Sequence, residues 1–208
     1  MANLPLEGFK ILDFSQVAFG PVCTRLLGDL GADVIKVEPL EGEISRLTSK
    51  RKGESMSFLT SNRSKRDICL NLNDPRGKDI ALEIAGKVDV IVQNFRPGVM
   101  ARLGLDYVAV RKINPKVIYA SFSMYGETGP LAHRRGGDPW AQGFTGMVAS
   151  QGSPEGPPYL AGHLVVDYTG AALNAFGIVT ALLMRERTGL GQEITNNLAN
   201  SGVYIQDT

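Results

Sequence analysis

The 208-residue sequence has little cysteine, little histidine and almost no net charge, and each shortage argues against a class of protein. Cys23 and Cys69 stand far apart and outside any C-x-x-C pair, so we expect neither a disulfide framework nor a zinc site. The two histidines, His133 and His163, lack metal-ligand spacing. A formal net charge of +1 favours neither nucleic acid nor a membrane surface as a partner.

Long apolar runs and targeting signals are also missing from the pattern. No apolar run reaches the length of a transmembrane helix, and residues 1–7 lack the charged-then-apolar order of a signal peptide. Hydrophobic residues make up 43% of the chain and charged residues 21%, which is typical of a globular protein. Together with the unpaired cysteines, these features predict a cytoplasmic protein.

Short apolar runs alternate with helical segments along most of the chain. Strands are expected at residues 9–14, 32–38, 66–72, 88–92 and 117–122, and helices at 21–30, 75–86, 98–114, 139–147 and 168–187. This alternation predicts an α/β fold with a Rossmann-like open parallel sheet and helices on both faces. Ligands of such sheets bind beyond the carboxyl ends of the strands. Those ends fall near residues 15–20, 38–43, 71–73, 93–97 and 123–129.

Two segments could hold an anionic ligand. The turn at residues 17–21 precedes a helix, whose first N–H groups can meet a phosphate, although an ordinary strand-to-helix turn is equally well supported. Of the dinucleotide fingerprint only Gly20 is present, which disfavours a nicotinamide site in spite of Glu38 at the end of the second strand. Residues 46–66 carry seven basic residues against one acid, Glu54. This basic segment predicts a phosphate-bearing small molecule, with RNA or a solvated loop as alternatives.

Asp167 is the strongest single candidate for chemistry. It directly precedes a long apolar helical segment, and Asp is among the preferred N-cap residues. Backbone N–H groups at a helix start would keep its carboxylate ionised. An ionised carboxylate held against a reactive carbonyl can attack it and form a covalent intermediate. Because Asp needs no base to be ionised at pH 7, His163 is expected to be structural.

Several short motifs occur in a fixed order along the chain. They are GFKILDF at 8–14, GADVIKVEP at 31–39, NRSKR at 62–66, NFRPGVM at 94–100, RLGL at 102–105, YGETGP at 125–130 and ERTGLGQ at 186–192. The ordered set resembles the class III CoA transferases, among them the formyl-CoA and carnitine CoA transferases, and the related α-methylacyl-CoA racemases.

The resemblance implies roles for individual residues. Coenzyme A, bound as a thioester substrate rather than as a tightly held cofactor, would contact a set of seven residues: Ala18, Asn62, Arg63, Lys65, Asn94, Phe95 and Arg102. Asp167 falls at the position of the transferases' nucleophile, which attacks an acyl-CoA and passes the CoA to a carboxylic acid through covalent aspartyl intermediates. Asp138 would help to shape the acceptor site.

Two departures from the family pattern refine this expectation. The racemases carry a Gly-His-Asp triplet whose His moves a proton, whereas this chain has Gly136-Gly137-Asp138, so transferase is favoured over racemase. Family members are also much longer. Residues 1–208 are therefore expected to be the large-domain part, without the small domain and the C-terminal return segment. The full-length protein is expected to be a homodimer, or a second polypeptide would supply the missing half; the alternative is a CoA-binding fragment without turnover.

Overall fold

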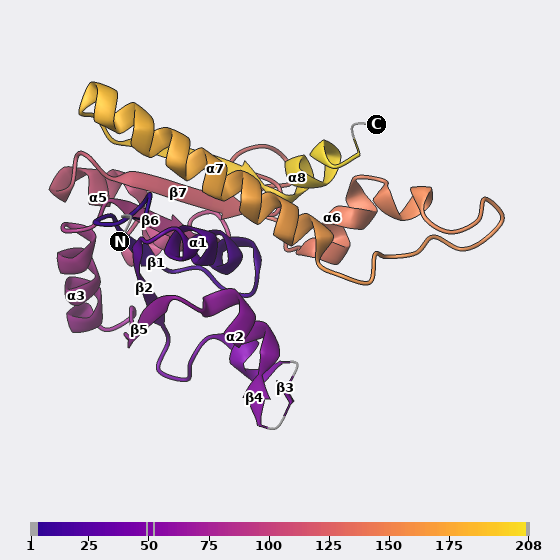
Figure 1. Ribbon diagram of the computed structural model, residues 1–208, viewed down its shortest axis with the longest axis horizontal. Coiled ribbons are helices and arrows are strands. Elements are labelled where there is room, and N and C mark those ends of the chain that lie inside the picture. Colours follow the sequence, from indigo (N-terminus) through magenta and orange to yellow (C-terminus); the bar gives the residue numbers. More distant parts are fainter. Residues whose placement is uncertain (1–3, 49, 52, 207–208) are drawn as a thin grey trace.

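The computed structural model describes residues 4–48, 50–51 and 53–206 and centres on one open sheet of six strands (Figure 1). The strands are β1 (Lys10–Asp13), β2 (Asp33–Glu38), β5 (Lys65–Cys69), β6 (Val90–Gln93), β7 (Ile118–Ser123) and β8 (Gln192–Asn197). Their order is β5-β2-β1-β6-β7-β8, and every neighbouring pair is parallel. The order reverses between β1 and β6, which is the switch point where Rossmann-like sheets bind ligands.

Helices cover both faces of this sheet, as the sequence predicts. One face carries α1 (Phe19–Asp29), α7 (Val165–Thr188) and α8 (Leu198–Tyr204), and the other carries α3 (Pro75–Ala85), α4 (Val99–Leu103) and α5 (Tyr107–Ile113). Side chains of a strand alternate between its two faces. Ile11 therefore joins the core under α1 and α7, while Leu12 joins the core under α3 and α5. The α/β prediction is confirmed.

Three local predictions differ from the structure. The helix expected at 98–114 is two helices, because Gly104 ends α4 with φ 68° and the Asp106 side chain caps α5. The edge strand β8 was not predicted, since its sequence QEITNN has neither an apolar run nor a buried face. Helix α7 begins at Val165, earlier than the predicted residue 168.

Two smaller parts project from the sheet (Figure 1). One contains the 3-10 turn η1 (Ile44–Leu47), the hairpin of β3 (Lys50–Arg51) and β4 (Glu54–Ser55), and α2 (Met56–Asn62). The other contains α6 (Asp138–Phe144), the 3-10 turn η2 (Met147–Ser150) and the loop that leads into α7. The first part connects β2 to β5, and the second lies between β7 and α7.

Helix α7 is long and apolar enough to cross a membrane by length and composition, with a mean hydropathy of 1.3 over its most apolar window. The expectation that no segment reaches this length is therefore wrong. One side of α7, which includes Val166, Ala171 and Ile178, is buried in the core under α1. A core helix passes the same test. Its other side exposes Phe176, Leu183 and Met184.

Candidate functional site

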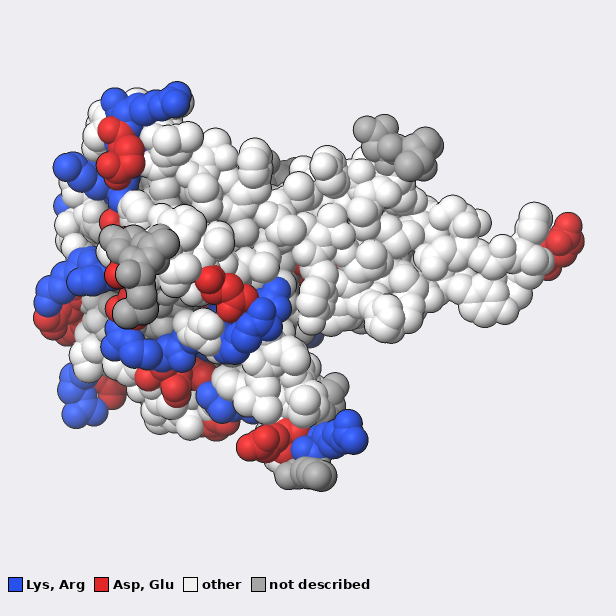
Figure 2. All heavy atoms as spheres, viewed as in Figure 1, with Lys and Arg blue, Asp and Glu red and all other residues white. Residues whose placement is uncertain are grey.

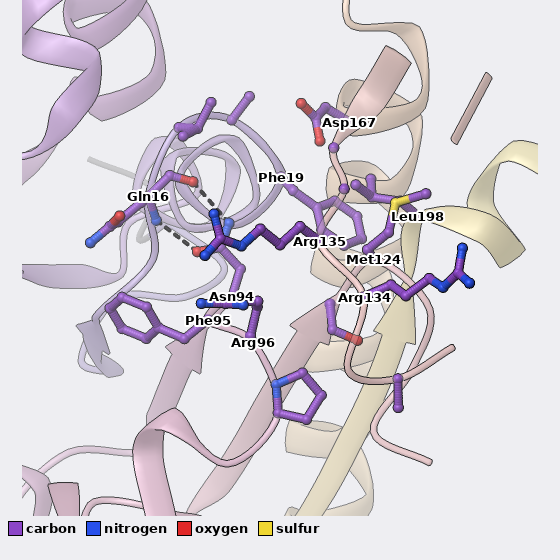
Figure 3. Close-up of a pocket in the computed structure, with 17 residues that line it drawn as sticks. Gln16, Phe19, Asn94, Phe95, Arg96, Met124, Arg134, Arg135, Asp167 and Leu198 are labelled. Carbon is purple, nitrogen blue, oxygen red and sulfur yellow. Dashed lines mark hydrogen bonds between the residues drawn. The ribbon is translucent and has the colours of Figure 1, made fainter. Parts of the chain in front are cut away.

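A pocket of about 510 Å³ lies at the carboxyl ends of β1, β6 and β7 (Figure 3). The β1–α1 loop, the segment after β6, the loop at residues 132–137 and the first turn of α7 form its walls. Four residues predicted from the sequence line it: Ala18, Asn94, Phe95 and Asp167.

A second pocket of about 520 Å³ lies over the ends of β2 and β5. It contains Arg102, another predicted residue, together with Glu38, Asn71 and Leu72. Gln16 and Phe95 line both pockets, so the two cavities adjoin at the switch point between β1 and β6. The strand ends expected to bind ligand are thus the ones that line the two cavities.

Asp167 occupies the third position of α7 rather than its N-cap, which is Leu164, so the prediction of an Asp167 cap is wrong. Its side chain is almost fully buried, and its carboxylate accepts no hydrogen bond from residues 4–48, 50–51 or 53–206. Burial, and secondarily the nearby Asp138 carboxylate, raise the pKa of Asp167 to about 7. The expectation that helix N–H groups would hold it fully ionised is therefore also wrong.

Those helix N–H groups bind Asp138 instead. Asp138 Oδ2 accepts the backbone N–H of Val166 at 2.7 Å and that of Asp167 at 2.8 Å. Asp138 Oδ1 accepts Gln142 Nε2 at 2.5 Å. Asp138 is buried and is not among the residues that line the pocket, so it contacts the start of α7 and not the cavity. Its expected part in an acceptor site stays a prediction.

The β1–α1 loop is held rigidly against the pocket. Asn94 Oδ1 accepts the Gln16 N–H and Asn94 Nδ2 donates to the Gln16 carbonyl, both at 2.8 Å, so Asn94 clamps the loop across the switch point. The next residue, Val17, has φ 68°, which a β-branched residue rarely adopts. Its N–H donates to Glu43 Oε1 at 2.9 Å. The loop therefore keeps a strained backbone in place beside Ala18, where α1 begins.

Four of the seven basic residues of the basic segment, Arg46, Arg63, Lys65 and Arg66, pair with acids from elsewhere in the fold, so most of its charge is balanced locally. Its predicted role in binding a phosphate-bearing molecule stays a prediction. Arg46 pairs with Glu38, Arg63 with Asp29 and Arg66 with Asp33, each at 2.6 Å. Figure 2 shows blue and red side chains interspersed on the face that it presents. Lys50 and Arg51 are exposed in β3, and Lys52 lies outside the described residues. None of Asn62, Arg63 and Lys65 lines either pocket.

Lys65 is buried at the centre of a polar network below the β1–α1 loop. Its Nζ donates to Asp13 Oδ2 at 2.9 Å, to the Pro21 carbonyl at 2.9 Å and to Asn62 Oδ1 at 2.8 Å. Burial alone would raise the pKa of Asp13, but the ammonium groups of Lys65 and Lys36 hold it well below its usual range. In this structure Lys65 and Asn62 connect β5, β1, α1 and α2.

Sequence reasoning did not single out several pocket residues. They are Gln16, Phe19, Arg96, Met124, Arg134, Arg135 and Leu198. In Figure 3 the Arg135 side chain extends over the pocket toward the β1–α1 loop, whereas Arg134 extends to the other side. The sequence signal that could have indicated Arg134 and Arg135 is their position as two adjacent arginines directly before the Gly136-Gly137 pair. His133 and His163 are exposed and line neither pocket, and no metal-binding group of His, Cys, Asp or Glu occurs in the described part of the chain.

Comparison with known proteins identifies the family. The model of CoA-transferase family III matches residues 6–208. The chain belongs to CoA-transferase family III. It is 44% identical to an acetyl-CoA:oxalate CoA-transferase of Acetobacter aceti, over 91% of the chain and 50% of that protein. It is 43% identical to a succinyl-CoA:glutarate CoA-transferase of Mus musculus, over 96% of the chain and 46% of that protein.

A solved structure shares the fold of this family III chain. The crystal structure of a CAIB/BAIF family protein from Brucella suis superposes with a TM-score of 0.95 at 34% identity, over 99% of the chain and 56% of that protein. The chain thus spans about half the length of the relatives it matches.

Proposed function

We propose that this chain carries the nucleophile and the CoA pocket of an enzyme that moves CoA from an acyl-CoA thioester to a carboxylic acid. The observation that carries the proposal is Asp167, a nearly buried carboxylate without a hydrogen-bond donor in the described structure, which lines a pocket at the switch point of the sheet. Membership of CoA-transferase family III supports the reaction class.

We propose that the two adjoining pockets together hold one acyl-CoA. We place the nucleotide in the pocket of Arg102, whose guanidinium forms no salt bridge within the described residues and can meet a phosphate. The pantetheine arm would cross the shared wall at Gln16 and Phe95 and bring the thioester to Asp167. Ala18 and Asn94 would form the side of this channel. Arg63, paired with Asp29 outside both pockets, would need to rearrange to bind CoA.

Asp167 would act by nucleophilic catalysis. Its carboxylate attacks the thioester carbonyl, and the CoA thiolate leaves to give an acyl-aspartyl anhydride. The thiolate then attacks the Asp167 carbonyl, which releases the donor acid and leaves an aspartyl-CoA thioester. The acceptor carboxylate repeats both steps in reverse. N–H groups of the first turn of α1, which has no acidic side chain, would stabilise the oxyanions.

The acceptor is proposed to be a small carboxylic acid. Relatives are named for oxalate and glutarate, and Arg96, Arg134 and Arg135 give the pocket a positive wall against an anion. Because anhydrides hydrolyse readily, the site needs more enclosure than an open pocket provides. We propose that residues 1–208 are the large-domain part of a cytoplasmic enzyme. We propose that the full-length enzyme is a homodimer, or that another polypeptide supplies the rest of the site.

Trapping with hydroxylamine tests the covalent mechanism. After incubation of the natural gene product with acetyl-CoA, hydroxylamine is expected to convert the Asp167 side chain into a hydroxamate, because it attacks either aspartyl intermediate. Peptide mass spectrometry locates the modification, and a sample without acyl-CoA is the control. Transfer activity without any modification of Asp167 would exclude the mechanism. Calorimetric CoA binding without transfer would instead indicate a CoA-binding fragment.

Gly137 allows a test against the racemase alternative. A Cβ at this position would meet no atom within 4 Å, and Gly137 lines the pocket. The pocket therefore has room for a histidine side chain at position 137, although the residue there is glycine. We expect the protein not to exchange the α-proton of 2-methylacyl-CoA in deuterated water, because Gly137 carries no acid or base. The measurement is deuterium incorporation by mass spectrometry, with Gly137→His as the comparison. Rapid exchange by the unmodified protein would indicate a racemase.

A further inference from the structure

We propose that Asp138 is the positioning residue of the nucleophile, holding Asp167 in place through the backbone N–H groups of α7 and setting a fixed negative charge beside its carboxylate. This inference rests on the proposed role of Asp167 as nucleophile. It assigns Asp138 to the enzyme's own machinery and not to contact with the acceptor acid.

The first argument is the geometry of the α6–α7 junction. Asp138 is the first residue of α6, and it receives the N–H groups of Val166 and Asp167 on a single oxygen. Leu164 at the N-cap contributes no side-chain hydrogen bond, so the cap of α7 comes from another helix. The orientation of Asp167 therefore depends on α6.

Gln142 extends this connection one step further. Its Nε2 donates to Asp138 Oδ1, and its Oε1 accepts the Ala161 N–H at 2.8 Å. Asp138 and Gln142 are both buried, with exposures of 2% and 1%. Asp138 accepts three N–H donors, for which a carboxylate has the acceptor capacity. The chain of contacts Ala161–Gln142–Asp138–α7 fixes the segment that enters α7 and the first turn that carries the nucleophile.

The second argument is electrostatic. The first-turn N–H groups of a helix favour an anion, but those of Val166 and Asp167 are directed at Asp138. Asp167 thus lies next to a fixed carboxylate, which disfavours a second negative charge. The other charged groups that share its pocket are the guanidinium groups of Arg96, Arg134 and Arg135, on the wall formed by the segment after β6 and by the loop at 132–137.

This arrangement suits a carboxylate that must attack a thioester. A carboxylate with a raised pKa is a stronger nucleophile once it is ionised. When Asp167 is acylated it loses its charge, and the repulsion from Asp138 is relieved as the negative charge passes to the departing thiolate. Asp138 thereby favours the covalent intermediate over the free carboxylate.

Asp138→Asn is the direct test, because it keeps the oxygen for the α7 N–H groups and removes the charge. The pKa of Asp167 is measured by the carbon-13 shift of its carboxyl group, with Asp167→Asn used for the assignment. We expect this pKa to fall in Asp138→Asn but to stay above its ordinary value, because burial, the larger cause of the raised pKa, remains. The acid limb of the pH profile of transfer should shift to lower pH by the same amount.

Two further variants separate positioning from general loss of structure. Asp138→Asn leaves its NH₂ group facing that of Gln142. The double variant Asp138→Asn with Gln142→Glu restores the hydrogen bond between the two side chains, keeps an acceptor for the Ala161 N–H, and moves the charge farther from Asp167. It gives up only the long contact from Gln142 Nε2 to the His163 carbonyl at 3.5 Å. It should recover thermal stability while the pKa of Asp167 stays below the wild-type value. Asp106→Asn removes the charge of the carboxylate cap of α5, which accepts the Ala109 N–H, and should leave the pKa of Asp167 unchanged.

The outcomes are distinct. An Asp167 pKa in Asp138→Asn equal to that of the unmodified protein overturns the proposal, whatever the activity. A lowered pKa together with failed trapping of Asp167 leaves the electrostatic role of Asp138 in place and removes the proposed function. Equal pKa shifts in Asp106→Asn and Asp138→Asn would show a non-specific effect and would also overturn the proposal.

Discussion

Asp167→Asn is expected to slow CoA transfer by about 10³-fold or more, because an amide cannot form the anhydride or the thioester. The same substitution is expected to stabilise the fold above pH 7. The amide is close in shape to the carboxylate, and in the described structure no hydrogen-bond donor is lost when the carboxylate is replaced. An ionised Asp167 would lower the free energy of unfolding while it serves catalysis, as expected from the trade-off between stability and activity.

The pH dependence follows from the direction of the pKa shift. The pKa of Asp167 is raised from 3.8 to about 7, so the folded state binds this proton more tightly than the unfolded state. Its favourable contribution to folding is complete below about pH 4 and is lost as the pH rises to about 7. At roughly 1.4 kcal/mol per pKa unit, the loss approaches ~4 kcal/mol above pH 7.

Chemical denaturation at pH 5 and pH 8 measures this effect. Asp167→Asn should exceed the unmodified protein in unfolding free energy by ~2–4 kcal/mol at pH 8 and by much less at pH 5. Asp106→Asn, at a partly buried helix cap that lines neither of the two pockets, serves as the control. A variant whose stability follows the unmodified protein at both pH values would show that Asp167 titrates normally.

Lys65→Met is expected to destabilise the fold by about 3–5 kcal/mol, because it leaves the buried Asp13 carboxylate without its closest cation. The Lys65 side chain is only 2% exposed and also binds the Pro21 carbonyl and Asn62. A loss of this size is a large share of the 5–15 kcal/mol that a typical domain has. Lys36 remains near Asp13 and limits the damage.

Comparison with Arg63→Met tests whether Lys65 acts on the fold or directly on CoA. The Arg63–Asp29 pair is exposed, and its removal should cost about 1 kcal/mol or less. The double variant Asp13→Asn with Lys65→Met should recover much of the stability lost by Lys65→Met, because no buried charge is left unpaired. If Lys65→Met instead keeps its stability and loses only CoA affinity, Lys65 contacts the ligand directly.

The basic segment shows where sequence reasoning stops. Seven basic residues within 21 positions predict a phosphate clamp when only their neighbours in sequence are considered. Four of the seven, Arg46, Arg63, Lys65 and Arg66, pair with Glu38, Asp29, Asp13 and Asp33, which come from β2, α1, β1 and β2 and are brought near by the packing of these elements against β5 and its neighbouring segments. Ion pairs form between side chains that are close in space, and these partners are far apart in the sequence. A local sequence pattern therefore does not reveal which basic residues are paired.

The sequence by itself determined the fold class, the strand ends that form the site, and the family. Apolar runs of strand length alternate with helical ones, and parallel strands place their carboxyl ends together, so these conclusions need only local patterns and chain connectivity. The tertiary structure decided the state of Asp167. Asp138, which lies 29 residues earlier in the sequence, accepts the N–H groups at the start of α7. The Asp167 carboxylate is therefore buried beside a like charge and receives no hydrogen bond from these N–H groups. The polarity around a side chain is set by what folds against it.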